Sequence, residues 1–221
     1  MEVHKRRFTV IALIVIFLIG TSRIFLGVHF LSDVLLGWAL GGVLVWVAYK
    51  LRRKISDRLS AISRGRRIAV IVAVAAVLVL MITGVRWAAA DWTLPGLWAE
   101  RAGDVDPFEL DGAFTFAGGW IGALIGYVLL STGRGSFKAS EGGWYRLVRF
   151  LLGIVVVAAL WFGLGQLFPR EADLLSYALR VVRYAAIGLW VTWLAPLVFE
   201  KLGLLEFHHE GTPIHREKGR V

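Results

Sequence analysis

Residues 68–85 read IAVIVAVAAVLVLMITGV, an uncharged apolar run that decides the fold class. A bilayer core about 30 Å thick needs about 20 mostly apolar residues to cross it as a helix. In lipid, the backbone N–H and C=O groups must bond within their own segment, which a helix achieves. The run lacks the alternation with a period of two that would indicate a strand. We therefore expect residues 68–85 to form a transmembrane helix.

Five further stretches share this length and composition. They are residues 8–26, 30–49, 113–130, 150–168 and 184–199. The only charges in them are Arg23 and Asp33, both near a span end, and the last stretch contains Pro196. The chain is 57% hydrophobic and 19% charged, against about 45–50% and about 25% in average soluble domains. The sequence predicts an all-α, polytopic membrane protein with about six transmembrane helices.

The net charge of +9 comes from loops that alternate along the chain. The N-terminus and the loops at residues 50–67 and 131–149 carry mostly basic charges. The charged residues between 86 and 112 are mostly acidic. By the positive-inside rule, we expect both termini and the basic loops to lie on the cytoplasmic side of a cell membrane. Basic residues beside membrane spans also meet anionic lipid headgroups. This pattern favours membrane lipids as partners and argues against nucleic acid.

Four polar residues gather where the first two spans are joined: Ser22, Arg23, His29 and Asp33. The orientation above places this junction on the extracytoplasmic side. His29 and Asp33 are four residues apart, so on a helix they share a face. A carboxylate orients an imidazole and stabilises its protonated form, and a guanidinium matches phosphate oxygens. These groups suit attack on phosphorus, with a histidine nucleophile, its orienting acid and an anion-binding arginine.

A purely structural interpretation fits the same residues. Arg23 could extend to the lipid headgroups along its apolar stem. His29 and Asp33 could form a pair that caps the following helix. The residue types and their spacing leave both interpretations open.

The pattern Ser22-Arg23-x5-His29-x3-Asp33 resembles the third signature of the type 2 phosphatidic acid phosphatase and vanadium haloperoxidase superfamily. A chance match in a chain of this length has a probability on the order of one in a thousand. Leu35–Trp38 is similar to the usual continuation of that signature. The resemblance implies that His29 forms a phosphohistidine, that Asp33 orients it, and that Arg23 and Ser22 bind phosphoryl oxygens. It implies a lipid phosphate or diphosphate substrate and no metal or other cofactor.

The first two signatures of that superfamily are absent from the sequence. The first needs an arginine before a proline, and the second needs a serine after one. The five prolines follow Leu94, Asp106, Phe168, Ala195 and Thr212 and precede Gly96, Phe108, Arg170, Leu197 and Ile214. The missing parts include the general-acid histidine and most of the phosphate clamp.

We therefore expect this chain to be the C-terminal part of a bacterial membrane phosphatase. As an N-terminally truncated chain it is expected to be inactive. The missing N-terminal half or a second copy of this chain is the expected protein partner. The alternative is a non-catalytic membrane protein that keeps a remnant site for an anion or a phospholipid headgroup.

The expected organisation has four parts. Residues 1–87 form the C-terminal part of a phosphatase-like helical core, 88–111 an extracytoplasmic acidic loop, 112–204 a three-helix membrane extension and 205–221 a cytoplasmic tail. The absence of cysteine excludes disulfides and thiolate metal sites, and we expect no metal site.

Two further patterns lie in the extension. Gly118, Gly122 and Gly126 recur every fourth residue, which predicts close packing against another helix. Arg180 and Arg183, three residues apart, are predicted to reach headgroups, with binding of an anionic lipid as a further possibility.

Overall fold

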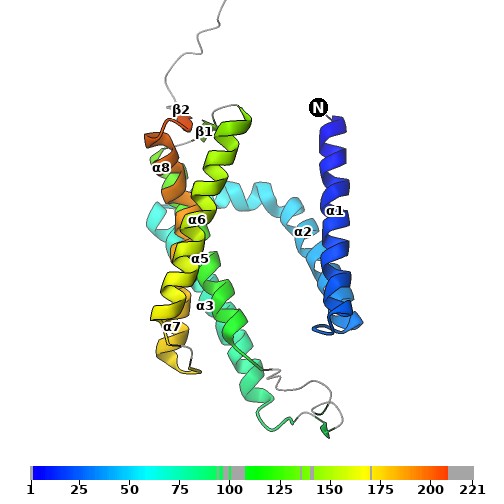
Figure 1. The fold of residues 1–221 in the computed structure, drawn as a ribbon. Coiled ribbons are helices and arrows are strands. Elements are labelled where there is room, and N and C mark those ends of the chain that lie inside the picture. Colours follow the sequence, from blue (N-terminus) through cyan, green and yellow to red (C-terminus); the bar gives the residue numbers. More distant parts are fainter. Residues whose placement is uncertain are drawn as a thin grey trace, which may run out of the picture. The chain divides into compact units, whose positions relative to one another are not determined.

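The computed structural model describes residues 2–93, 95–96, 100, 108–134, 136–139, 142–169 and 171–208. The chain divides into two compact units, Met1–Ala61 and Ile62–Val221. Figure 1 shows the helices of each unit.

Within the described residues, six helices are long and apolar enough to cross a membrane, as the sequence predicted. They span Arg7–Phe25, Leu31–Ser60, Arg64–Ala88, Asp111–Gly133, Gly143–Leu167 and Leu174–Lys201. Several extend beyond the apolar runs. The second continues through basic residues to Ser60, and the last begins at Leu174 rather than near Tyr184. Charged residues with long side chains are good helix formers, so a helix can continue beyond the end of its apolar segment. The protein is a multi-pass membrane protein.

The first unit is a helical hairpin of α1 (Glu2–Phe25) and α2 (Leu31–Ser60). Trp38 of α2 stacks on Phe17 of α1, with 5.8 Å between ring centroids. Gly20 faces the same indole, and a Cβ there would lie 2.5 Å from it. The absence of a side chain at Gly20 therefore lets Trp38 lie directly against α1.

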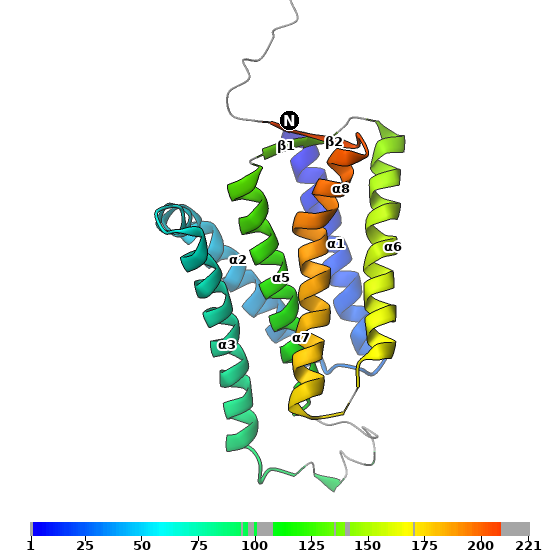
Figure 2. The same ribbon diagram turned by 90° about the vertical axis from the view of Figure 1, so that its left-hand side faces the viewer.

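The second unit contains α3 (Arg64–Ala88), α5 (Asp111–Gly133), α6 (Gly143–Leu167) and a last helix built from three segments. These segments are α7 (Leu174–Leu189), the π-helical η1 (Trp190–Leu194) and α8 (Ala195–Lys201). Within this unit α5 packs against both α3 and α7, and α6 packs against α7 (Figure 2).

Glycines set the distance between α5 and α7. A Cβ at Gly118 would lie 2.5 Å from the carbonyl oxygen of Val181, and a Cβ at Gly122 would overlap the backbone of Ala185. From the other side, a Cβ at Gly188 would lie 2.5 Å from the backbone nitrogen of Ala123. The predicted packing role of the glycine repeat is confirmed, because the two backbones touch where side chains are missing.

The π-helical segment precedes the proline of the last span. Proline has no N–H and its ring clashes with the carbonyl four residues earlier, which disrupts an α-helix. Here the N–H of Ala195 bonds to the carbonyl of Trp190, five residues back, and Pro196 lies in the first turn of α8. The wider turn allows the helix to continue past Pro196.

Two short strands, which the sequence did not predict, pair with each other at one end of this unit. β1 (Ser136–Ala139) pairs antiparallel with β2 (Leu205–His208), with Phe137 opposite Phe207. Leu205 is 3% exposed and packs with Leu130 and Phe207. Residues 205–208, the start of the expected cytoplasmic tail, therefore form a strand that closes a small apolar core. Its continuation from residue 209 lies outside the described residues.

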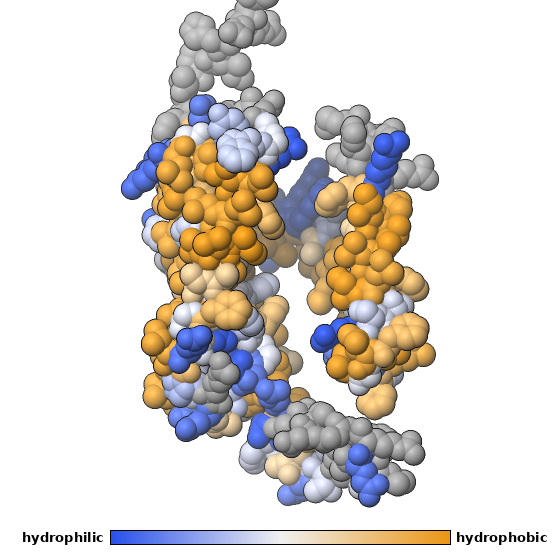
Figure 3. Space-filling view, viewed as in Figure 1, coloured by the Kyte–Doolittle hydropathy of each residue, from blue (hydrophilic) through white to orange (hydrophobic). Residues whose placement is uncertain are grey.

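The helix surfaces of both units are largely apolar (Figure 3). In the first unit most large apolar side chains of α1 and α2 are exposed, Phe8 at 75% and Leu44 at 68% among them. Such exposure is excessive for a protein in water and is expected where lipid covers the helices.

We predict that Gly122→Ala destabilises the protein by about 1–3 kcal/mol, since an added methyl group in a close-packed interface forces the backbones apart. Gly119→Ala, on the same helix, is the matched control, because a Cβ at Gly119 meets nothing within 4 Å. It should be neutral or stabilising by up to about 1 kcal/mol, the intrinsic preference of helices for alanine. Thermal unfolding in detergent micelles compares the two. Equal stability of the variants would contradict the packing role.

Candidate active site

The end of α1 is shaped by one glycine. Gly27 has a φ of 69°, a left-handed conformation that costs other residues steric strain. The N–H of Gly27 donates to the carbonyl of Ile24 at 3.0 Å, and the N–H of Val28 donates to that of Arg23 at 3.2 Å. These two bonds form a Schellman motif, which ends a helix and satisfies its last carbonyls. The chain therefore reverses direction within a few residues of Arg23.

The start of α2 is capped by a carboxylate. The backbone N–H of Phe30 donates to Asp33 Oδ2 at 3.0 Å, and the Ser32 hydroxyl lies 3.4 Å from Asp33 Oδ1. A carboxylate in the first turn also interacts favourably with the positive end of the helix dipole. Asp33 therefore has the capping role that the structural interpretation assigned to it.

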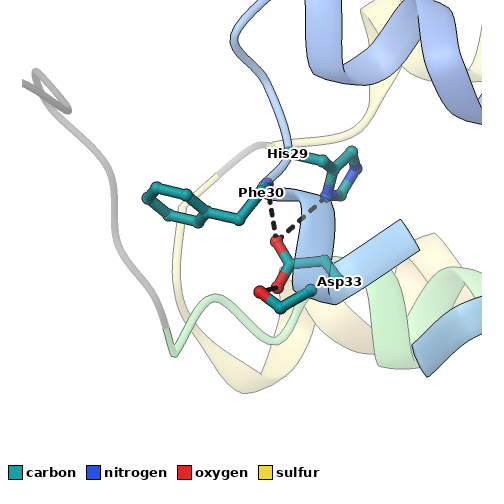
Figure 4. Close-up of polar contacts among 4 residues, drawn as sticks. His29, Phe30 and Asp33 are labelled. Carbon is teal, nitrogen blue, oxygen red and sulfur yellow. Dashed lines mark hydrogen bonds and ion pairs between the residues drawn. The ribbon is translucent and has the colours of Figure 1, made fainter. Parts of the chain in front are cut away.

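The same carboxylate faces His29. Asp33 Oδ2 lies 3.8 Å from His29 Nδ1, within ion-pair distance but longer than a hydrogen bond. Figure 4 shows the imidazole and the carboxylate facing each other, with the Phe30 ring pointing away from both. The two side chains are 44% and 48% exposed. With Nδ1 facing Asp33, the other ring nitrogen, Nε2, is left for a further partner.

Arg23 and Ser22 lie on the last turn of α1. The Ser22 hydroxyl donates to the carbonyl of Ile19 at 2.8 Å, so its proton is used within the helix. Arg23 is exposed, and with the residues described here its guanidinium forms neither a hydrogen bond nor an ion pair. The side chains of His29 and Asp33 therefore face each other directly. Arg23 and Ser22 lie at the end of α1, next to the turn that the backbone hydrogen bonds around Gly27 form.

Two residues that shape this turn were not identified from the sequence. Gly27 lies two residues after the end of a helix with a basic last turn, and a glycine just past such a turn is a known signal for a helix C-terminus. Phe30 supplies the N–H that Asp33 binds, a contact with no sequence signal because every residue except proline has that group.

Family comparisons match both ends of the chain. Residues 2–57 match a family described as the PAP2 superfamily. Residues 114–208 match one described as PAP2 superfamily phosphatase, transmembrane extension. The first match contains Ser22, Arg23, His29 and Asp33, and the second begins within α5 and ends at β2.

Among curated proteins, the chain is similar to phosphatidylglycerophosphatase B of Bacillus subtilis (strain 168), at 42% identity over 52 residues. The aligned part is 24% of this chain, and it covers only about a quarter of the length of that relative, 26%. No solved structure matches the chain. The two family matches together cover more than half of the chain and agree with each other and with the six apolar helices. The chain belongs to the PAP2 superfamily of membrane phosphatases.

Proposed function

We propose that the chain carries the nucleophile of a phosphatase that acts on a lipid phosphate or diphosphate, at the hairpin turn of α1 and α2. The observation that supports this most strongly is the pairing of His29 with Asp33 at 3.8 Å on a turn that also carries an arginine without a partner among the described residues. The similarity to a phosphatidylglycerophosphatase supports a phosphorylated glycerolipid as the substrate class.

In the proposed reaction, His29 Nε2 attacks the phosphorus atom. The Nε2–P bond forms as the bond from phosphorus to the lipid oxygen breaks, and that oxygen leaves with the electron pair and takes up a proton. Water then attacks the phosphohistidine, releases phosphate and restores the imidazole. The positive charge that develops on His29 is stabilised by Asp33.

Arg23 is proposed to bind the phosphoryl oxygens, with Ser22 beside it. A guanidinium presents two parallel N–H groups that match two phosphate oxygens and stabilises charge that develops there. The Ser22 hydroxyl can donate to a phosphate oxygen only by giving up its bond to the carbonyl of Ile19. Arg23 is therefore the stronger of the two proposed phosphate ligands.

The same proposal includes the orientation of the chain. The basic residues at the end of α2 and in the following turn place that end on the cytoplasmic side of the cell membrane. The His29 turn, at the opposite end of α2, then faces the extracytoplasmic side, as do residues 88–111, and both termini are cytoplasmic.

We further propose that the chain of residues 1–221 alone is a poor catalyst. The sequence has neither of the first two superfamily signatures, so it lacks their general-acid histidine and most of the phosphate clamp. The remaining groups would bind a phosphate but lack the proton donor for the leaving oxygen. The alternative, a non-catalytic membrane protein with a remnant anion site, shares the binding step and differs in the chemistry.

Orthovanadate, a tetrahedral mimic of phosphate, tests the binding step. We predict saturable binding to the purified chain in detergent, abolished by His29→Ala and weakened about tenfold or more by Arg23→Ala, because charge-assisted bonds to an anion are lost. Arg58→Ala, which removes a positive charge from the last turn of α2, is the matched control and should change binding less than twofold. Binding that is unchanged in Arg23→Ala and His29→Ala would contradict the site.

Asp33→Asn separates the capping role from the orienting role. Asparagine keeps an oxygen that accepts the Phe30 N–H but has no charge to stabilise a protonated His29. We predict thermal stability within about 1 kcal/mol of the wild type, with clearly weaker vanadate binding. Asp33→Ala should lose both. Full vanadate binding in Asp33→Asn would show that the carboxylate acts only as a helix cap.

Activity is predicted to be low. General-acid catalysis contributes typically about 10²–10⁴-fold to the rate. Release of phosphate from phosphatidate or phosphatidylglycerol phosphate by this chain should therefore be slower by at least about 10²-fold than release by the Bacillus relative, assayed in parallel. A comparable rate that His29→Ala abolishes would overturn the proposed inactivity and uphold the nucleophile.

Gly27 is predicted to hold Arg23 and His29 together. Gly27→Ala should destabilise the turn by about 1 kcal/mol or more, because alanine is strained in the left-handed conformation, and should weaken vanadate binding as well. Gly37→Ala in α2, where a Cβ meets nothing within 4 Å, is the control and should leave both unchanged or slightly improved. Circular dichroism melts and vanadate titration measure the two effects. Identical behaviour of the two variants would exclude a special role for Gly27.

A further inference from the structure

A cavity of about 430 Å³ lies in the second unit, between the last turns of α6 and the first half of α7. Its wall combines apolar and polar side chains, including Trp161, Phe162, Gln166, Arg180, Arg183 and Tyr184. Every one of these residues belongs to α6 or α7, which pack against each other. Neither family match assigns a ligand to this cavity, and the residues of the His29 turn do not line it.

Arg183 is the unusual residue of the wall. Its Nε is fully buried and has no hydrogen-bond partner. One terminal nitrogen donates to the Tyr184 hydroxyl at 3.3 Å, and the same oxygen accepts from Trp161 Nε1 at 3.2 Å. A buried N–H of a charged group without a partner is costly, so the protein leaves the Arg183 guanidinium incompletely satisfied beside the cavity.

The charges around the cavity do not balance. Arg180 forms an ion pair with Asp111, the first residue of α5. Arg183 has no carboxylate within ion-pair distance in the described ranges. Among the described residues, the wall therefore carries one positive charge without a counter-ion, and burying an unpaired cation is unfavourable.

The position along the helix indicates what kind of anion would fit. The last span is 28 residues long, so at 1.5 Å per residue it measures about 42 Å and exceeds a hydrocarbon core of about 30 Å. Arg183 lies about 14 Å from Leu174 along this helix by the same rise, so with the excess length shared equally between both ends it lies about 8 Å inside the hydrocarbon core. Ionisable residues at such depth face a cavity or a partner and mark binding sites by default.

A glycine makes room for the guanidinium. A Cβ at Gly165 of α6 would lie 2.7 Å from a terminal nitrogen of Arg183. The Phe162 and Trp161 rings lie in the same wall, one turn earlier on α6. The cavity therefore offers a cation beside an aromatic surface, which suits a ligand with a charged head and an apolar body.

We propose that this cavity binds the phosphate group of an anionic membrane lipid, with Arg183 as its main ligand and Arg180 as a second contact. The lipid phosphate would accept from the terminal nitrogens of Arg183, and the acyl chains would extend along the apolar wall into the bilayer. This proposal does not depend on the His29 turn, because the cavity lies within the second unit and uses none of those residues.

The test measures lipid binding to the full chain by native mass spectrometry from detergent. We expect phosphatidylglycerol to bind saturably, phosphatidylcholine to bind at least tenfold more weakly, and Arg183→Gln to weaken phosphatidylglycerol binding about tenfold. Arg146→Gln, which removes a positive charge at the opposite end of α6, is the matched control and should change binding less than twofold. Vanadate binding at His29 should be unchanged in Arg183→Gln.

A second variant perturbs the same site without removing a charge. Gly165→Val fills the space beside Arg183 without removing a charge, and it should also weaken phosphatidylglycerol binding. Inorganic phosphate in the same titration distinguishes the source of the anion. Phosphate that binds at Arg183 and is not displaced by lipid would overturn the lipid assignment. Equal phosphatidylglycerol binding by the wild type, Arg183→Gln and Gly165→Val would overturn the site.

Discussion

Hydrocarbon offers no hydrogen bonds, and the rest of this structure depends on that constraint. Each long segment must satisfy its own backbone groups as a helix, so polar chemistry is confined to helix ends and to cavities between helices. The His29 turn is of the first kind, because it joins the C-terminus of α1 to the N-terminus of α2. The cavity at Arg183 is of the second kind.

The turn between α1 and α2 shows how a structural requirement and a chemical one can use the same residues. The helix ends need a glycine in a left-handed conformation and a carboxylate that binds the first free N–H, and Gly27 and Asp33 supply them. That carboxylate also faces His29, so the group that begins α2 is the one proposed to orient the nucleophile. Substitutions that preserve the cap and remove the charge are therefore more informative than deletions.

Much of the fold could be predicted from the sequence, since apolar runs of sufficient length specify spans independently of their neighbours. The helix end at Ser60 could not, because charged residues beyond the lipid are also good helix formers. The start at Leu174 was missed because Arg180 and Arg183 interrupt an otherwise mostly apolar helical segment. The pairing of β1 with β2 was missed because it joins segments far apart in the chain, and four residues are too few for a periodic pattern. For the site, the spacing of His29 and Asp33 predicted that they lie close, but His29 precedes α2, so they meet across the start of the helix and not along one helix face. In the second unit, the neutralisation of Arg180 by Asp111 depends on helix packing that the sequence does not display.

The most direct measurement of the central claim uses an activated aryl phosphate, whose leaving group needs no general acid. The purified chain is incubated with the radiolabelled compound and quenched in base, in which phosphohistidine survives. The account predicts an acid-labile label on His29 that is absent from His29→Ala and reduced in Arg23→Ala. A folded chain that binds vanadate yet acquires no label, or a label that persists in His29→Ala, would contradict the assignment of His29 as the nucleophile.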